Sequence, residues 1–299
     1  MKCVTPTVHS FFHKDSSTCT HVAYDPSTKD GVLIDPVTDL DMVNWQASST
    51  YNQEVAAWIT ANGIKLHAVM DTHTHADHIT GGAYFADKFH VPYCIGDKIT
   101  GVQSTFAGLF DLKGFPCAGA QFGRLLKAEE EFMAGTLSIR CIPTNGHTPN
   151  CLSYHIGDAV FTGDALFIED FGTGRCDFPG GSAADLYDSL MRLYALPGET
   201  RVFVGHDYQP GGRPLRVEST IGVEREKNED MTIRATKEEF VAMKQKWDAT
   251  LNLPKMIFPS LLANMNGGKL PEPHPNGHRY FVIPMNIRQK TNDIGEAQK

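Results

Sequence analysis

Short apolar runs separated by polar turns open the chain. Residues 3–12, 18–24 and 31–35 are rich in β-branched and aromatic side chains, and turn-forming residues such as Asp25-Pro-Ser separate them. Runs of this length and composition, bounded in this way, predict β-strands.

Helical and strand-like spacing then alternates. Apolar residues at helical spacing predict helices over 52–61 and 80–90, the second opened by Thr80. Short apolar runs predict strands over 64–70 and 91–95. Strands, a helix and a further strand form the first of two α/β halves.

The second half repeats this order. Residues 132–142 and 151–162 resemble hairpin-connected strands, and Gly157-Asp158 supplies a turn. A helix with apolar residues on one face begins at Ser182 and ends at Pro197-Gly198. Those apolar positions are expected to belong to the core.

The C-terminal region differs in composition. A Pro- and Gly-rich loop is expected at 209–214, and an amphipathic helix is predicted over 238–249. Pro-rich and apolar stretches alternate along residues 253–275. The stretch from about 236 to 299 is too short to bury a good core alone. We therefore expect a single domain over residues 1–299, with residues 236–299 as an extension packed on it.

The densest group of metal-ligand residue types follows the strand expected at 64–70. The sequence His-Thr-His-Ala-Asp-His supplies His73, His75, Asp77 and His78. Neutral imidazole suits Zn, Fe, Ni or Cu, and a carboxylate adds charge. Surface loops also contain such residues, but ligand types clustered at this density are rare without a metal.

Three further strand-like runs each end in a candidate ligand. These ligands are His147, Asp164 and His206, and Gly163 and Gly205 stand directly before the last two. Glycine allows a tight backbone turn there, and ligands of α/β structures bind beyond the carboxyl ends of strands. Each residue alone would be ordinary, but together with the four before them they predict one metal centre.

This set of ligands resembles the signature of the metallo-β-lactamase superfamily. His-x-His-x-Asp-His, a lone His, a lone Asp and a last His map onto the chain without a gap. Phe-Thr-Gly-Asp-Ala-Leu at 161–166 and Gly-Arg-Cys-Asp-Phe at 174–178 are similar to the persulfide dioxygenase branch, over about residues 5–235. The resemblance implies an α/β fold, the four-layer αβ/βα sandwich, with the metal at one edge between the sheets.

The residues alone leave the number of metal ions open. If all seven ligands bind, Asp164 could bridge two ions, such as Zn, Fe or Mn, that activate water for hydrolysis. If only His73, His147 and Asp164 bind, one ion has two imidazoles and a carboxylate on a single face, as in non-haem Fe(II) oxygenases. The resemblance implies this second case, with one Fe(II) per chain. The other four residues would then orient the three ligands instead of binding the ion. They are His75, Asp77, His78 and His206. Asp77 and His78 are also predicted to be catalytic residues.

The implied reaction is the oxidation of glutathione persulfide, or a similar small persulfide, by O₂ to sulfite and thiol. Arg175 and Tyr208 match positions that contact the thiol carrier, and Arg175 could pair bidentately with a carboxylate. Their alternative roles are a surface salt bridge and a half-buried aromatic.

Two departures put the glutathione carrier in doubt. Asn228-Glu-Asp-Met231, with Asp230, stands near the position where glutathione users carry an arginine. The insertion Asp170-Phe-Gly-Thr also lengthens a loop over the site. Carboxylate recognition could then come from Arg213 or Arg216, or the carrier could differ.

Two other functions use the same ligands. A glyoxalase-II-like thioesterase would hydrolyse acyl-glutathione with two metal ions instead of one iron. A non-enzymatic metal or sulfur-carrier binding protein is the second alternative, although open coordination positions favour catalysis.

Composition narrows the classes further. A net charge of −8 argues against nucleic acid as a partner, no apolar run approaches the ~18 residues of a membrane span, and the N-terminus is not expected to be a secretory signal. The seven cysteines are scattered without a Cys-x-x-Cys pair, which indicates free thiols and, most simply, the cytoplasm. Cys176, beside Arg175, is expected to be structural, and a homodimer is compatible with these features.

Overall fold

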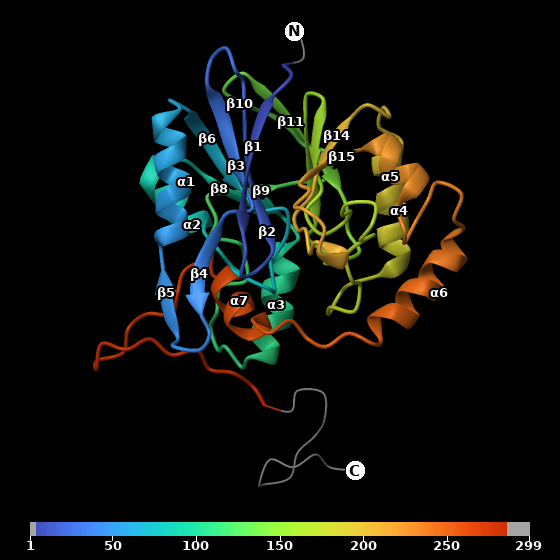
Figure 1. Ribbon diagram of the computed structural model, residues 1–299. Coiled ribbons are helices and arrows are strands. Elements are labelled where there is room, and N and C mark those ends of the chain that lie inside the picture. Colours follow the sequence, from blue (N-terminus) through green and yellow to red (C-terminus); the bar gives the residue numbers. More distant parts are fainter. Residues whose placement is uncertain (1–3, 286–299) are drawn as a thin grey trace, which may run out of the picture.

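Two six-stranded sheets form the centre of the computed structural model, which describes residues 4–285 (Figure 1). In spatial order the first sheet consists of β1 (Thr7–His13), β2 (Thr18–Tyr24), β3 (Asp30–Ile34), β6 (Lys65–Met70), β8 (Tyr93–Gly96) and β9 (Arg124–Leu126). The second sheet consists of β10 (Glu131–Ala134), β11 (Leu137–Pro143), β12 (Leu152–Ile156), β13 (Ala159–Phe161), β14 (Arg201–Phe203) and β15 (Glu218–Thr220).

The two sheets pack face to face. Val32, Ala68 and Met70 of the first sheet share a buried cluster with Ile139 and Phe161 of the second. In each sheet an antiparallel part adjoins parallel pairs, such as β3 with β6 and β13 with β14. Parallel pairs bring strand carboxyl ends to the same edge, and that edge is where the candidate ligands follow.

Helices cover both outer faces. On the first sheet lie α1 (Thr50–Ala61), α2 (Gly82–Phe89), α3 (Ile99–Leu109) and α7 (Ile257–Asn264). On the second lie α4 (Ala183–Tyr194), α5 (Ile221–Lys227) and α6 (Lys237–Asp248). The order helix, sheet, sheet, helix confirms the expected four-layer αβ/βα sandwich. None of these helices in the described range is both long and apolar enough to cross a bilayer.

The C-terminal extension contacts both halves of the sandwich. Phe240 of α6 packs in the cluster on the second sheet, and Ile257 and Leu261 of α7 pack in the cluster on the first. A capping box at Thr236 and Glu239 starts α6, since each residue bonds the other's backbone N–H. The linker between α6 and α7 therefore crosses from one half to the other.

Several predicted elements are confirmed with shifted boundaries. Ser182 caps α4 by accepting a hydrogen bond from the Asp185 N–H, and β12 and β13 form the hairpin around Gly157, whose φ is +61°. A turn at Gly135, with φ +60°, was not predicted and divides residues 132–142 between β10 and β11, which form a further hairpin. Alternating apolar residues on both sides of the turn conceal it in the sequence.

Other elements were not predicted. The start of the helix expected over 80–90 is wrong, because Ile79–Thr80 forms β7, which pairs with β4 (Val37–Asp41), and α2 begins at Gly82. The hairpin of β4 and β5 (Gln46–Ser48) and the helices α3, α5 and α7 have weak sequence patterns. They depend on tertiary contacts for their stability.

Candidate metal centre

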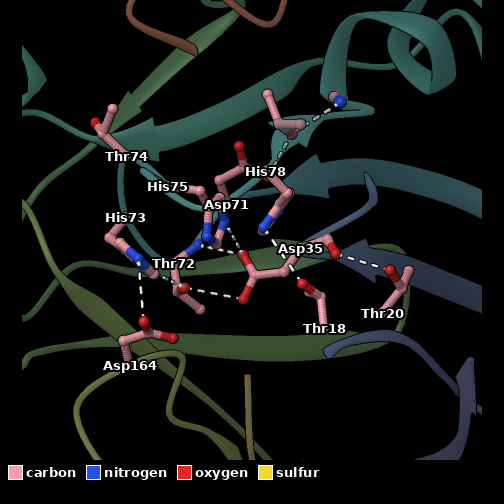
Figure 2. Close-up of polar contacts among 12 residues, drawn as sticks. Thr18, Thr20, Asp35, Asp71, Thr72, His73, Thr74, His75, His78 and Asp164 are labelled. Carbon is pink, nitrogen blue, oxygen red and sulfur yellow. Dashed lines mark hydrogen bonds and ion pairs between the residues drawn. The ribbon is translucent and has the colours of Figure 1, made fainter. Parts of the chain in front are cut away.

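Loops from both sheets bring the seven candidate ligands together. The histidine loop (residues 71–78) joins β6 to β7 and carries four of them, of which Figure 2 labels His73, His75 and His78. The loops after β11, β13 and β14 carry His147, Asp164 and His206. All are buried except Asp77, whose side chain is partly exposed.

Asp164 lies at the centre of the group. Its Oδ2 is 3.5 Å from His147 Nε2 and 3.9 Å from His73 Nε2, and its Oδ1 is 3.3 Å from His206 Nε2. His206 Nε2 also lies 3.4 Å from Asp77 Oδ2. The Asp164 carboxylate therefore stands between two sets of imidazoles.

Five buried atoms of this group have no hydrogen-bond partner among the described residues. A buried polar atom without a partner costs about 1–3 kcal/mol, and these atoms lie in or beside two groups of possible ligands, His73, His147 and Asp164 in one and His75, Asp77 and His78 in the other. A cation bound by nitrogen and oxygen lone pairs would satisfy such atoms. The atoms are His73 Nε2, His75 Nδ1, His78 Nε2, Asp164 Oδ1 and His206 Nε2.

The opposite ring nitrogens are held by the protein, which fixes the tautomers. His147 Nδ1 lies 2.7 Å from the Arg175 carbonyl, and His206 Nδ1 lies 3.2 Å from the Ser17 carbonyl. Because a carbonyl oxygen only accepts, each Nδ1 carries the proton and donates it. The lone pair of each Nε2 is left facing Asp164, as a metal ligand requires.

Asp35 is a functional residue that the sequence reasoning missed. It follows β3, and its carboxylate accepts hydrogen bonds from the Thr72 N–H, the Thr72 hydroxyl and His75 Nε2, the last at 3.1 Å (Figure 2). The proton of His75 is thereby held on Nε2 and its Nδ1 lone pair faces the cluster. The available signal was an aspartate directly after an apolar strand, at the same sheet edge as the ligands.

Burial and neighbouring charges shape the protonation of the cluster. Burial and the nearby His75 ring hold the pKa of His73 well below its usual value. For His206, burial acts to lower the pKa, but the carboxylates of Asp164 and Asp77 outweigh it and the pKa is raised. A metal ion needs deprotonated ligands, so the neutral His73 ring is ready to bind one, whereas His206 would give up its proton when an ion binds.

A cleft of about 850 Å³ leads from the cluster to the surface. Its walls include Leu40 and Met42 of the β4–β5 hairpin, and Trp247 and Met256 of the C-terminal extension. The floor contains His147 and the other ligands that face the cleft. The described part of the extension thus forms part of the wall of this cleft.

Tyr208 and Arg175 both line this cleft. The Tyr208 ring stacks on His206, with centroids 5.5 Å apart, and lies 4.7 Å from Phe171 of the inserted loop. The Arg175 Nε and Nη2 donate to the Asp177 carboxylate at 2.6 and 2.7 Å, and its Nη1 donates to the Asn252 carbonyl at 2.8 Å. Arg175 therefore already holds one carboxylate and ties the cleft wall to the C-terminal extension.

The alternative carboxylate-binding arginines lie elsewhere. Arg213 pairs with Asp170 and Asp207, Arg216 pairs with Glu169, and neither lines the cleft. The structure thus does not place them for recognition of a substrate carboxylate, because Asp170 and Asp207 occupy the guanidinium of Arg213 and Glu169 occupies that of Arg216.

Two residues near the insertion are structural. Asp230 accepts hydrogen bonds from the Thr173 N–H and hydroxyl, at 2.9 and 2.8 Å, and so braces the inserted loop. Burial raises the pKa of the Cys176 thiol to about 12. That thiol stays protonated and unreactive at neutral pH, as expected of a structural cysteine.

Comparisons with known proteins agree with this geometry. A model of the metallo-β-lactamase superfamily matches residues 15–206. The chain is 38% identical over 290 residues to a probable metallo-hydrolase of Burkholderia pseudomallei (93% of this chain, 99% of that protein). It is 36% identical over 282 residues to glyoxylase B2 of Dictyostelium discoideum (93% and 97%).

Proteins named as persulfide dioxygenases or their homologues are also similar. The chain is 32% identical over 266 residues to the mitochondrial persulfide dioxygenase ETHE1 of Bos taurus (87% of this chain, 88% of that protein). The crystal structure of ETHE1 from Myxococcus xanthus has a TM-score of 0.69 and 32% identity, over 88% of this chain and 100% of that one. The chain therefore belongs to the metallo-β-lactamase superfamily, with persulfide dioxygenases among its relatives.

Proposed function

We propose that this chain is a persulfide dioxygenase that uses one Fe(II) ion. The observation that carries the proposal is the grouping of His73, His147 and Asp164, each of which offers a ligand atom within 4.8 Å of the other two. These residues come from three separate strand ends and supply two imidazoles and one carboxylate. That donor set, with open positions facing a cleft, is typical of non-haem Fe(II) oxygenases.

The proposed reaction is RSSH + O₂ + H₂O → RSH + SO₃²⁻ + 2H⁺. The terminal sulfur of the persulfide is oxidised to sulfite, the S–S bond breaks, and O₂ accepts the four electrons. When bound, Fe(II) would supply the redox chemistry that brings O₂ and sulfur together. No protein nucleophile is required.

The chain's own residues would orient the substrate and exclude water. Asp164 and the two imidazoles would hold the ion, while the Arg175 carbonyl keeps the His147 lone pair aimed at it. Tyr208 and Phe171 lie beside the cluster and would shield the reacting sulfur from solvent. Small-molecule persulfide and O₂ are thus the expected partners. The cysteines of the described part are free thiols, which fits a cytoplasmic location.

Metal replacement and an O₂ electrode test the proposal. Protein purified without oxygen and loaded with Fe(II) should consume O₂ and release sulfite in equal amounts when given glutathione persulfide. The Zn(II)-loaded protein is the control and should do neither, because Zn(II) has no redox chemistry. Thioester hydrolysis without O₂ uptake in both forms would reject the dioxygenase.

A two-metal thioesterase is the second candidate. It is favoured by the position of His206, whose Nε2 lies between Asp77 and Asp164 and could serve a second ion. The similarity to glyoxylase B2 points the same way. Hydrolysis of lactoyl-glutathione by a protein that holds two ions per chain would support it, whereas one iron per chain supports the oxygenase.

A further inference from the structure

The last residue of α7 contacts the backbone of the histidine loop. Asn264 is only 2% exposed, and its side-chain Nδ2 donates to the carbonyls of His75 and His78, both at 2.8 Å. Its Oδ1 accepts from the Thr80 N–H at 2.9 Å. The side-chain amide of Asn264 therefore makes all three of its hydrogen bonds with the backbone of residues 75–80.

The chain around Asn264 is fixed in place. Gly268 has φ +76°, and a Cβ there would come within 2.8 Å of the Thr80 side chain. Only glycine allows this conformation and this close approach. The turn after α7 thus holds the amide against the loop.

We propose that Asn264 is a positioning residue of the metal centre. Through it, the C-terminal extension holds the backbone of the histidine loop in the position that metal binding requires. The directions in which His75 and His78 point depend on the backbone from which they project. Without the amide, two buried carbonyls would lose their hydrogen bonds, and the loop would shift to recover them. The superfamily match ends at residue 206, far before this helix.

A reciprocal effect follows. If Asn264 prepares the loop for a metal ion, then the bound ion must stabilise the docking of α7 by the same free energy. The inference requires a metal at the histidine loop but not a particular reaction. It would hold for the thioesterase as well as for the dioxygenase.

Two substitutions and a matched control test it. Asn264→Ala removes all three hydrogen bonds, and Asn264→Asp keeps the acceptor for Thr80 but loses both donors. Gln103→Ala is the control, because Gln103 is also a buried amide with three hydrogen bonds and braces Met265, but it does not touch the histidine loop. All three variants should lower the melting temperature of the metal-free protein.

The metal readout separates positioning from simple stability. In competition with a chelator, both Asn264 variants should bind Zn(II) about 10–100-fold more weakly, the range known for residues that orient ligands. The visible absorption of the Co(II)-loaded protein should also change, because its intensity and position report ligand geometry. Gln103→Ala should change the Zn(II) affinity by less than about 3-fold, well below the range for residues that orient ligands. Unchanged affinity and an unchanged Co(II) spectrum in Asn264→Ala would overturn the proposal.

A wild-type measurement does not depend on any variant folding. Amide hydrogen exchange at residues 261–268 should slow when Zn(II) is added to the metal-free protein. Residues of α5, which lies on the other half, should show a smaller change. Equal exchange at 261–268 with and without the ion would refute the link between α7 and the metal.

Discussion

Two buried carboxylates in this protein are stabilised in different ways. Asp164 is 8% exposed and lies between His73 Nε2 and His206 Nε2, which have no hydrogen-bond partner among the described residues. Glu224, on α5, is fully buried and accepts one hydrogen bond from Asn228 at 3.0 Å. Burial raises the pKa of Glu224 to about 7.

The difference lies in the neighbours. Around Asp164 the protein supplies further lone pairs, so a cation can satisfy the carboxylate and the imidazoles at once. Around Glu224 the described residues supply one hydrogen-bond donor, Asn228, and no cluster of ligand atoms, so a proton is the simplest way to remove the buried charge. A buried acid therefore indicates a metal site only when other ligand atoms converge on it.

The largest expected effect comes from removing the carboxylate of the cluster. Asp164→Ala should abolish metal binding, measured as metal content after dialysis, and with it all turnover, because no other carboxylate comes from that strand end. Its fold should remain, as judged by circular dichroism. Glu224→Ala is the matched control and should keep its metal. Full activity with normal iron content in Asp164→Ala would contradict the assignment.

A smaller effect, on KM, is expected from removing Arg175, the arginine that pairs with the Asp177 carboxylate. Arg175→Ala should raise KM for glutathione persulfide by about 10-fold and leave kcat within about 3-fold, because it removes binding shared by the ground and transition states. Steady-state kinetics of the iron form measure both constants. An unchanged KM would show that Arg175 serves only the Asp177 pair and the wall contact to Asn252.

The smallest effect concerns the pH dependence of stability. The folded-state pKa of Glu224, about 7, is above its ordinary value of 4.5, so the folded protein binds this proton more tightly than the unfolded chain. Its contribution to stability is intact below about pH 4.5 and is lost as the pH rises through about 7. Glu224→Gln should therefore be near neutral at pH 5 and stabilise by about 1–3 kcal/mol at pH 8.

Urea unfolding of the metal-free protein at both pH values checks this. Glu226→Gln, on the same helix but exposed, is the control and should change stability little at either pH. An equal effect of Glu224→Gln at pH 5 and pH 8 would mean that Glu224 is ionised throughout, and the contrast with Asp164 would disappear.

Most of the long elements were predictable from local pattern. The strands β2, β3 and β6 and the helix α4 follow from alternating or helical apolar spacing and clear end signals such as Ser182. The short elements were not, because β7 has only two residues and α7 begins without a side-chain cap. Such elements are stabilised by contacts with distant segments, which local pattern does not contain.

Sequence pattern was enough to select the seven candidate ligands, since so many metal-binding residue types at strand ends rarely occur together without a metal ion. The tertiary structure alone decided how they are held. Asp35 orients His75 from 40 residues away in the sequence, and Asn264 reaches His75 from 189 residues away. A ligand's chemistry is local to its side chain, whereas its direction is set by hydrogen bonds to groups that only folding brings near.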